Sequence, residues 1–205
     1  MFSFSTESGK VESLFEVPRE RGPITEIGAD EENIFVIADG QKFSLYSLPD
    51  CVAMILGSTP EPVLHGDSFH KDGIFIYVDG QADALWLVAP EGSGDIEIPD
   101  ELCTFPNNVA RWGSTVVLSC KKNVVSGWYN RIRDTLYDIW WPMTGKTAVH
   151  SIAAMGEVIV EQHKVVIDTR FIAVADENGL WFGTRSMSQM KLFSNAKPLD
   201  IAFTH

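Results

Sequence analysis

The sequence predicts an all-β protein, a small or partial β-propeller of about four to five blades, with a β-sandwich or barrel as the alternative. Two phrases forty positions apart support this prediction: NIFVIADG at residues 33–40 and GIFIYVDG at residues 73–80. Each is an apolar run that ends in Asp-Gly and leads into a second run of alternating apolar and polar residues, which is typical of a β-hairpin. Short strands that recur about every 40 to 50 residues are typical of propeller blades.

Later segments repeat this hairpin pattern in looser form. In STVVLSCKKNVVSGWY, residues 114–129, Lys122 and Asn123 replace the Asp-Gly pair, and VIVEQHKVVI, residues 158–167, is a further hairpin candidate. RFIAVADENGLWFGT, residues 170–184, is clearer because Asn-Gly supplies the turn. Helix is scarce, and we expect one or two helical turns only around Tyr129–Trp141, where apolar residues fall near helical spacing.

A short strand-like phrase precedes most of the hairpins. These phrases start at Pro23, Pro62, Asn108 and Ala148, and KPLDIAFTH at residues 197–205 looks like a further copy without its hairpin. A propeller must leave no blade face bare. We therefore expect either that a strand near Phe2–Phe4 completes the blade begun by this last phrase, or that another polypeptide completes it by strand addition.

The phrases PLDIAFTH and FIAVADENGLWFGT resemble the repeat of the regulator of chromosome condensation family. The matching positions are Ile27-Gly28 with Asp39-Gly40 and Phe43, and Asn178-Gly179 with Trp181 and Gly183. The resemblance implies a propeller and, for one branch of the family, nucleotide exchange on a small GTPase. The family's Gly-Gln-Leu-Gly signature is absent and seven repeats do not fit into 205 residues, so no residue match transfers that activity. The WD-repeat family fits less well, because the sequence lacks Trp-Asp dipeptides.

Composition restricts the environment and the partners. Residues 1–105 hold 20 acids and 5 bases, a net charge of −15, whereas residues 106–205 hold 8 acids and 11 bases, a net charge of +3. The acidic balance makes nucleic acid an unlikely partner, because phosphate neutralisation needs a dense basic patch. No apolar run reaches membrane-spanning length.

The cysteines and the length lead to two further expectations. Cys51, Cys103 and Cys120 are widely spaced and odd in number, which fits buried thiols in a reducing compartment better than disulfides. We therefore expect a cytoplasmic or nuclear protein. We also expect a single domain over residues 1–205, with an insertion around residues 129–145.

No segment predicts catalysis, a metal or a cofactor. HGDSFHKD, residues 65–72, gathers two histidines and two aspartates, but their spacing lacks the i, i+4 helical placement of zinc enzymes. TGKT, residues 144–147, resembles the end of a phosphate-binding loop, yet the glycine that such a loop needs is replaced by Trp140. The expected protein is not an enzyme.

The segment GWYNRIRDTLYDIWWP, residues 127–142, predicts a partner-binding site. Tryptophan, tyrosine and arginine dominate binding hot spots. The candidate residues are Trp128, Tyr129, Arg131, Arg133, Tyr137 and Trp141. A core role for the aromatic side chains remains the alternative. The predicted function is a non-catalytic protein-binding module or subunit of a larger complex, and the alternatives are a small-GTPase regulator and a compact propeller hydrolase or lyase.

Overall fold

The structure, a computed structural model, describes residues 2–4, 11–13, 16–29, 32–48, 50–67, 74–81, 84–89, 92–96, 98, 101–121, 123–130, 135–144, 149–156, 158–161, 164–168, 170–184, 187, 190–196 and 201. Its only helical element in these residues is a short 3-10 helix, η1 (Arg19–Arg21). No helix in this described part is long and apolar enough to cross a membrane.

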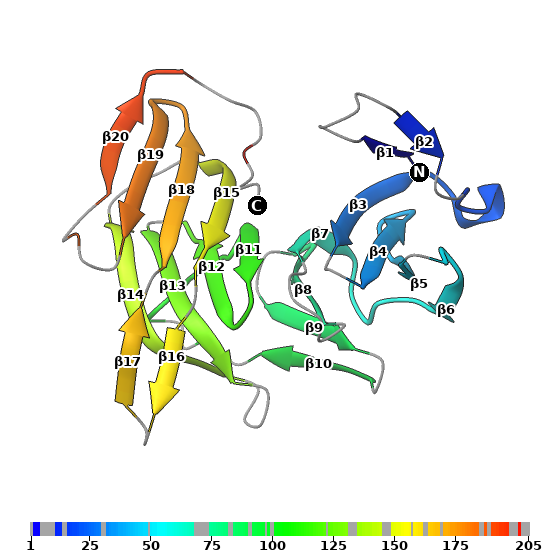
Figure 1. Cartoon of the computed structure of the whole chain (residues 1–205), viewed down its shortest axis with the longest axis horizontal. Coiled ribbons are helices and arrows are strands. Elements are labelled where there is room, and N and C mark those ends of the chain that lie inside the picture. Colours follow the sequence, from blue (N-terminus) through cyan, green and yellow to red (C-terminus); the bar gives the residue numbers. More distant parts are fainter. Residues whose placement is uncertain are drawn as a thin grey trace.

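The described strands form four four-stranded antiparallel sheets (Figure 1). The first sheet contains β3 (Ile24–Ala29), β4 (Asn33–Ala38), β5 (Lys42–Ser47) and β6 (Ala53–Leu56). The second contains β7 (Val63–Asp67), β8 (Phe75–Asp79), β9 (Leu85–Ala89) and β10 (Gly92–Ile96). The third contains β11 (Asn108–Trp112), β12 (Thr115–Ser119), β13 (Asn123–Asn130) and β14 (Thr135–Thr144). The fourth contains β15 (Val149–Met155), β18 (Phe171–Asp176), β19 (Gly179–Thr184) and β20 (Lys191–Ser194).

Two small hairpins accompany the four sheets. One pairs β1 (Phe2–Phe4) with β2 (Val11–Ser13), and the other pairs β16 (Val158–Glu161) with β17 (Lys164–Asp168). The second hairpin interrupts the fourth sheet, because β15 pairs with β18 rather than with the strand that follows it in the chain. The predicted hairpin at residues 158–167 is therefore confirmed, although it forms a sheet of its own.

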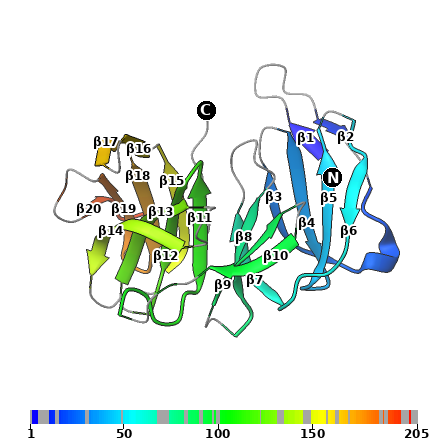
Figure 2. The same cartoon turned by 90° about the horizontal axis from the view of Figure 1, so that it is seen from below.

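The four sheets stand side by side along an arc. Their first strands are neighbours in sequence order: β3 lies beside β7, β7 beside β11, and β11 beside β15. The first and fourth sheets occupy opposite ends of the long axis in both views (Figures 1 and 2). The phrases that start at Pro23, Pro62, Asn108 and Ala148 supply these first strands. The predicted fold class, an all-β partial propeller, is confirmed.

The second strand of each sheet explains why the sheets pack against one another. Nearly every residue of β4, β8, β12 and β18 is buried, so both faces of these strands are covered. Because successive side chains of a strand point to opposite faces, covering both requires a layer on each side. Between the first and second sheets, Phe35 stacks on Phe75, with ring centroids 5.6 Å apart. The two sequence phrases are thus equivalent strands of successive sheets.

The Asp-Gly turn of the first hairpin has the geometry that its residues predict. Asp39 has a φ of 55° and Gly40 a φ of 74°, and together with Gln41 they connect β4 to β5. The N–H of Gln41 donates to the carbonyl oxygen of Ala38 over 3.2 Å, which makes Asp39 and Gly40 the central residues of the turn. Positive φ at both central residues is the signature of the type I′ turn, whose twist matches that of a hairpin. The second phrase turns more widely, because residues 80–84 separate β8 from β9.

The helix expected around Tyr129–Trp141 is wrong. The described residues of this segment belong to β13 and β14, which pair with each other at the edge of the third sheet. Part of the range expected as an insertion, Thr135–Thr144, is therefore the fourth strand of a sheet. The physical reason is that tryptophan, tyrosine and isoleucine favour a pleated surface, and an open edge on β13 is available to pair with them.

The expectation that the cysteines are all thiols is also wrong. Cys103 and Cys120 form a disulfide with a Cα–Cα distance of 5.5 Å, while Cys51 is free. Cys103 lies in the connection that leads into β11, and Cys120 directly follows β12. Because β11 and β12 are paired with Asn108 opposite Ser119, the hairpin brings the two flanking cysteines together. The pairing is a consequence of the fold that residue spacing alone does not reveal.

The core between the first and second sheets contains a tyrosine with a shifted pKa. Tyr77 of β8 is fully buried among the side chains that join the first two sheets. Burial raises the pKa of Tyr77 to about 12, because the phenolate would lose its hydration.

A glycine substitution tests the type I′ turn. Gly40→Ala should lower the free energy of unfolding by about 1 kcal/mol, because alanine resists positive φ even though no atom obstructs its Cβ. Gly57→Ala is the matched control, since its Cβ would also meet open space but its backbone is not left-handed. Urea denaturation should show little loss for the control. Equal losses in both variants would contradict the turn assignment.

Alkaline pH tests the burial of Tyr77. A tyrosine in the unfolded chain ionises near pH 10, whereas the folded chain holds Tyr77 neutral up to about pH 12. Ionisation therefore favours the unfolded state, and the free energy of unfolding should fall as the pH rises from about 10 towards 12. Tyr77→Phe should lose less stability over this interval in urea denaturation. A parallel decline in both proteins would place Tyr77 in contact with water.

Candidate protein-binding surface

Four of the six predicted binding residues lie on the paired strands β13 and β14. Trp128 lies opposite Thr115 of β12 on one side and opposite Tyr137 of β14 on the other. Tyr129, the next residue of β13, is opposite Leu136. Because neighbouring residues of a strand point to opposite faces, Trp128 and Tyr129 serve different sides of the third sheet.

Tyr129 belongs to the core between the second and third sheets. Its side chain is only 5% exposed and packs in a cluster that includes Cys103, Cys120 and Leu136. Its backbone N–H donates to the carbonyl oxygen of Ser114 over 2.6 Å. The tyrosine therefore contributes to packing, as the core alternative for this aromatic segment anticipates.

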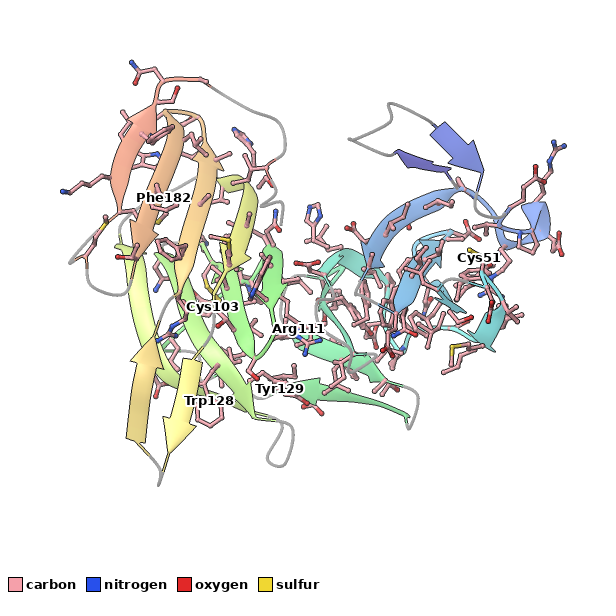
Figure 3. The ribbon with its side chains drawn as sticks, in the orientation of Figure 1. Cys51, Cys103, Arg111, Trp128, Tyr129 and Phe182 are labelled. Carbon is pink, nitrogen blue, oxygen red and sulfur yellow. A yellow bond between two sulfur atoms is a disulfide. The ribbon has the colours of Figure 1, made fainter. Side chains whose placement is uncertain are left out.

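Among the candidates whose side chains the structure describes, Trp128 is partly exposed and Tyr129 is buried. Trp128 is paired with Tyr137 across the two strands, and its place on the third sheet is marked in Figure 3. Tyr137 and Trp141 lie on β14, but only their backbone is described. Arg131 and Arg133 fall outside the described residues. The strands thus bring the backbones of four of the six candidates together on one hairpin.

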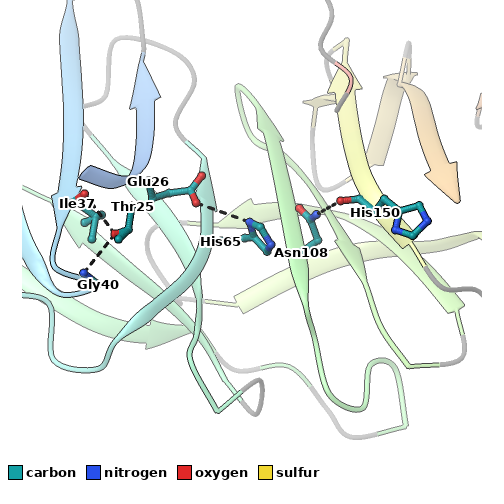
Figure 4. A network of polar contacts seen from close by, with 7 residues as sticks. All are labelled: Thr25, Glu26, Ile37, Gly40, His65, Asn108 and His150. Atoms are coloured by element: carbon teal, nitrogen blue, oxygen red, sulfur yellow. Dashed lines mark hydrogen bonds and ion pairs between the residues drawn. The ribbon is translucent and has the colours of Figure 1, made fainter. Parts of the chain in front are cut away.

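Polar contacts join the first strands of successive sheets. His65 Nδ1 of β7 lies 3.7 Å from Glu26 Oε2 of β3, and Asn108 of β11 donates through Nδ2 to the carbonyl oxygen of His150 over 3.3 Å (Figure 4). Within β3, Thr25 ties the strand to the first turn by accepting from the N–H of Gly40 at 3.2 Å. The first two contacts link neighbouring sheets, and the third lies within the first sheet.

The middle junction is the most buried of the three. Arg111 of β11 donates through its backbone N–H to Asp67 Oδ2 over 2.8 Å and through Nη1 to the carbonyl oxygen of Ile74 over 2.7 Å. Two residues of the considered metal motif, His65 and Asp67, therefore act in junctions between sheets. The described residues contain no group of three or more side chains suited to hold a metal ion.

The sequence interpretation missed the exposed apolar side chains at the outer edges. Val52, Met54 and Leu56, in and beside β6, are between 58% and 59% exposed. Phe105 and Phe193 are also exposed, at 56% and 76%. For Val52, Met54 and Leu56 the sequence offers only the apolar run CVAMIL, residues 51–56. Its position after a hairpin does not indicate that these side chains are exposed.

Comparison with known proteins supports the fold. No family model and no curated protein matches the sequence. The WD40 repeats of RRP9 match with a TM-score of 0.58 and 10% identity, over 92% of this chain and 55% of that chain. Hsv2p from Kluyveromyces lactis matches with a TM-score of 0.51 and 10% identity, over 80% and 49%. Hsv2 from Kluyveromyces marxianus matches with a TM-score of 0.50 and 7% identity, over 80% and 46%.

These neighbours are propeller-type structures, and the chain spans about half the length of each. At such low identities the likeness concerns the fold alone. It confirms the resemblance to propeller repeats. It gives no support for the regulator of chromosome condensation family in particular, since the neighbours are of the WD40 type, the family that the sequence motifs favoured less.

Two alanine substitutions separate core from surface on β13. Tyr129→Ala should lower the free energy of unfolding by about 3 kcal/mol, because it leaves a cavity between two sheets. Trp128→Ala should cost clearly less, since its side chain is already partly in water. Chemical denaturation of both variants provides the comparison. A larger loss for Trp128→Ala would make this tryptophan the structural residue of the pair.

Proposed function

We propose that the chain is a non-catalytic protein-interaction module that serves as a subunit of a larger complex. The observation that supports this most is the architecture, because an array of propeller-type sheets presents extended edges and connections on which binding residues can vary. WD40-type neighbours favour the same role. The acidic first half of the sequence favours a protein partner over nucleic acid.

The β13–β14 hairpin is the proposed contact surface. Trp128 of β13 is paired with Tyr137 of β14, and Trp141 lies further along β14. Arg131 and Arg133 stand between the two strands in the sequence. Large aromatic side chains beside arginines supply contact area and directed hydrogen bonds, the combination that hot spots use.

A double charge reversal tests this surface. Arg131→Glu with Arg133→Glu should abolish capture of partner proteins from native extract, because the new charges repel acidic groups that the arginines would meet. The melting temperature should stay close to that of the unmodified chain. Quantitative pull-down with mass spectrometry, together with thermal unfolding, measures both outcomes.

The matched control reverses two exposed charges on other elements. Arg19→Glu with Lys191→Glu produces the same change in net charge, on η1 and on β20. This control should capture the same partners as the unmodified chain. Loss of capture in both double variants would show a dependence on net charge alone. A collapse of stability in the first variant, with binding retained by the folded fraction, would make the arginines structural.

A further inference from the structure

The connection between the second and third sheets is held at four successive places. Cys103 is bonded to Cys120, and Asn123 Nδ2 donates to the carbonyl oxygen of Leu102 over 3.2 Å. The backbone N–H of Lys121 donates to the carbonyl oxygen of Thr104 over 3.1 Å. The N–H of Asn107 donates to the carbonyl oxygen of Ser119 over 2.9 Å. A surface connection held this firmly presents its remaining side chain in a fixed place.

That side chain is Phe105. It is 56% exposed, and its backbone φ of 53° lies in the left-handed region that bulky residues avoid. The ammonium of Lys121 lies 5.1 Å from the centre of its ring, within the range of a cation–π contact. A phenyl ring that stays in contact with water contributes little to folding, and a left-handed backbone adds strain. Packing therefore gives no reason for a phenylalanine here, and strained residues cluster at binding sites.

We propose that Phe105, together with Lys121, is a contact site for a partner protein that offers an apolar pocket with an acidic rim. The ring would fill the pocket, and the exposed ammonium beside it would pair with the rim. The choice of an acidic rim follows from Lys121, whose exposed ammonium lies beside the ring. This proposal rests on the proposed protein-binding function and places a site of that function outside the β13–β14 hairpin.

The disulfide between Cys103 and Cys120 is the clamp that holds Phe105 in place. Both cysteines are buried in the core between the second and third sheets. Reduction by a dithiol breaks the S–S bond, places a hydrogen on each sulfur and converts the reductant to its own disulfide. The connection then keeps its backbone hydrogen bonds but loses its covalent attachment, so Phe105 is presented less firmly. Binding at this site is consequently sensitive to redox conditions.

Hydrogen exchange of the whole chain tests the clamp without a partner. In the double variant Cys103→Ala with Cys120→Ala, and in the unmodified chain after dithiothreitol treatment, the amides of Asn107 and Lys121, which hold the connection, should exchange about tenfold faster. Amides of β4 and β5 serve as the internal control and should not change. If the alanine variant fails to fold, the dithiothreitol arm still decides, with thiol titration confirming reduction. Unchanged exchange in a reduced, folded chain would overturn the clamp.

Binding measurements with a captured partner test the contact itself. Phe105→Ala should weaken the partner's Kd by about 30-fold, the loss expected for an aromatic hot spot. Phe193→Ala is the matched control, because it removes another exposed phenylalanine from β20 and should leave the Kd unchanged. Lys121→Glu should weaken binding at low salt, whereas tighter binding would exclude an acidic rim.

The outcomes distinguish this site from the wider proposal. If Phe105→Ala binds as tightly as the unmodified chain while the charge reversal of Arg131 and Arg133 abolishes capture, the Phe105 site is wrong and the protein-binding function stands. If the unmodified chain captures no protein, the proposed function itself fails. If Phe105→Ala and Phe193→Ala weaken binding equally, the effect is one of general surface hydrophobicity, and the specific pocket is refuted.

Discussion

The burial of each sheet's second strand on both faces is the constraint on which the structure depends. A strand such as β4 or β8 offers an apolar side chain to both sides, and a single sheet cannot cover both. The next sheet along the chain supplies one cover, as the stacking of Phe35 on Phe75 illustrates. On the other side of the first sheet, Val17 and Leu48 pack against Ile34, Val36 and Tyr46. Repetition of the apolar phrase along the chain therefore implies repetition of sheets in space.

The same constraint separates the parts of the molecule that hold the fold from those that are available for binding. First and second strands are engaged by packing and by the junction contacts of Glu26, Asp67 and Asn108. Exposed apolar side chains occur on β6, on β20 and at Phe105 in the connection before β11, and also on the first strands, at Ile24 and Ile27 of β3 and Leu64 of β7. A scaffold of this kind varies its binding residues without disturbing its core.

Several features of the fold could be predicted because they depend on local chemistry. Asp39 and Gly40 specify a tight turn, and the apolar run before them specifies a buried strand, so the repeating hairpins follow from the sequence. The features that failed depend on tertiary neighbours. Residues around Leu136 have a spacing that suits either a helix or a strand, and the open edge of β13 decides between them. The Cys103–Cys120 bond and the burial of Tyr129 likewise arise from how a hairpin folds and which sheet lies beside it.

The central claim is that the two phrases containing Phe35 and Phe75 lie in successive sheets that pack face to face. A nuclear Overhauser measurement between the ring protons of these two phenylalanines, in the complete chain with selectively labelled rings, tests it most directly. The 5.6 Å separation of the ring centroids places ring protons of the two side chains close together and predicts a clear cross-peak. Absence of that cross-peak in the folded protein would contradict the stacked array.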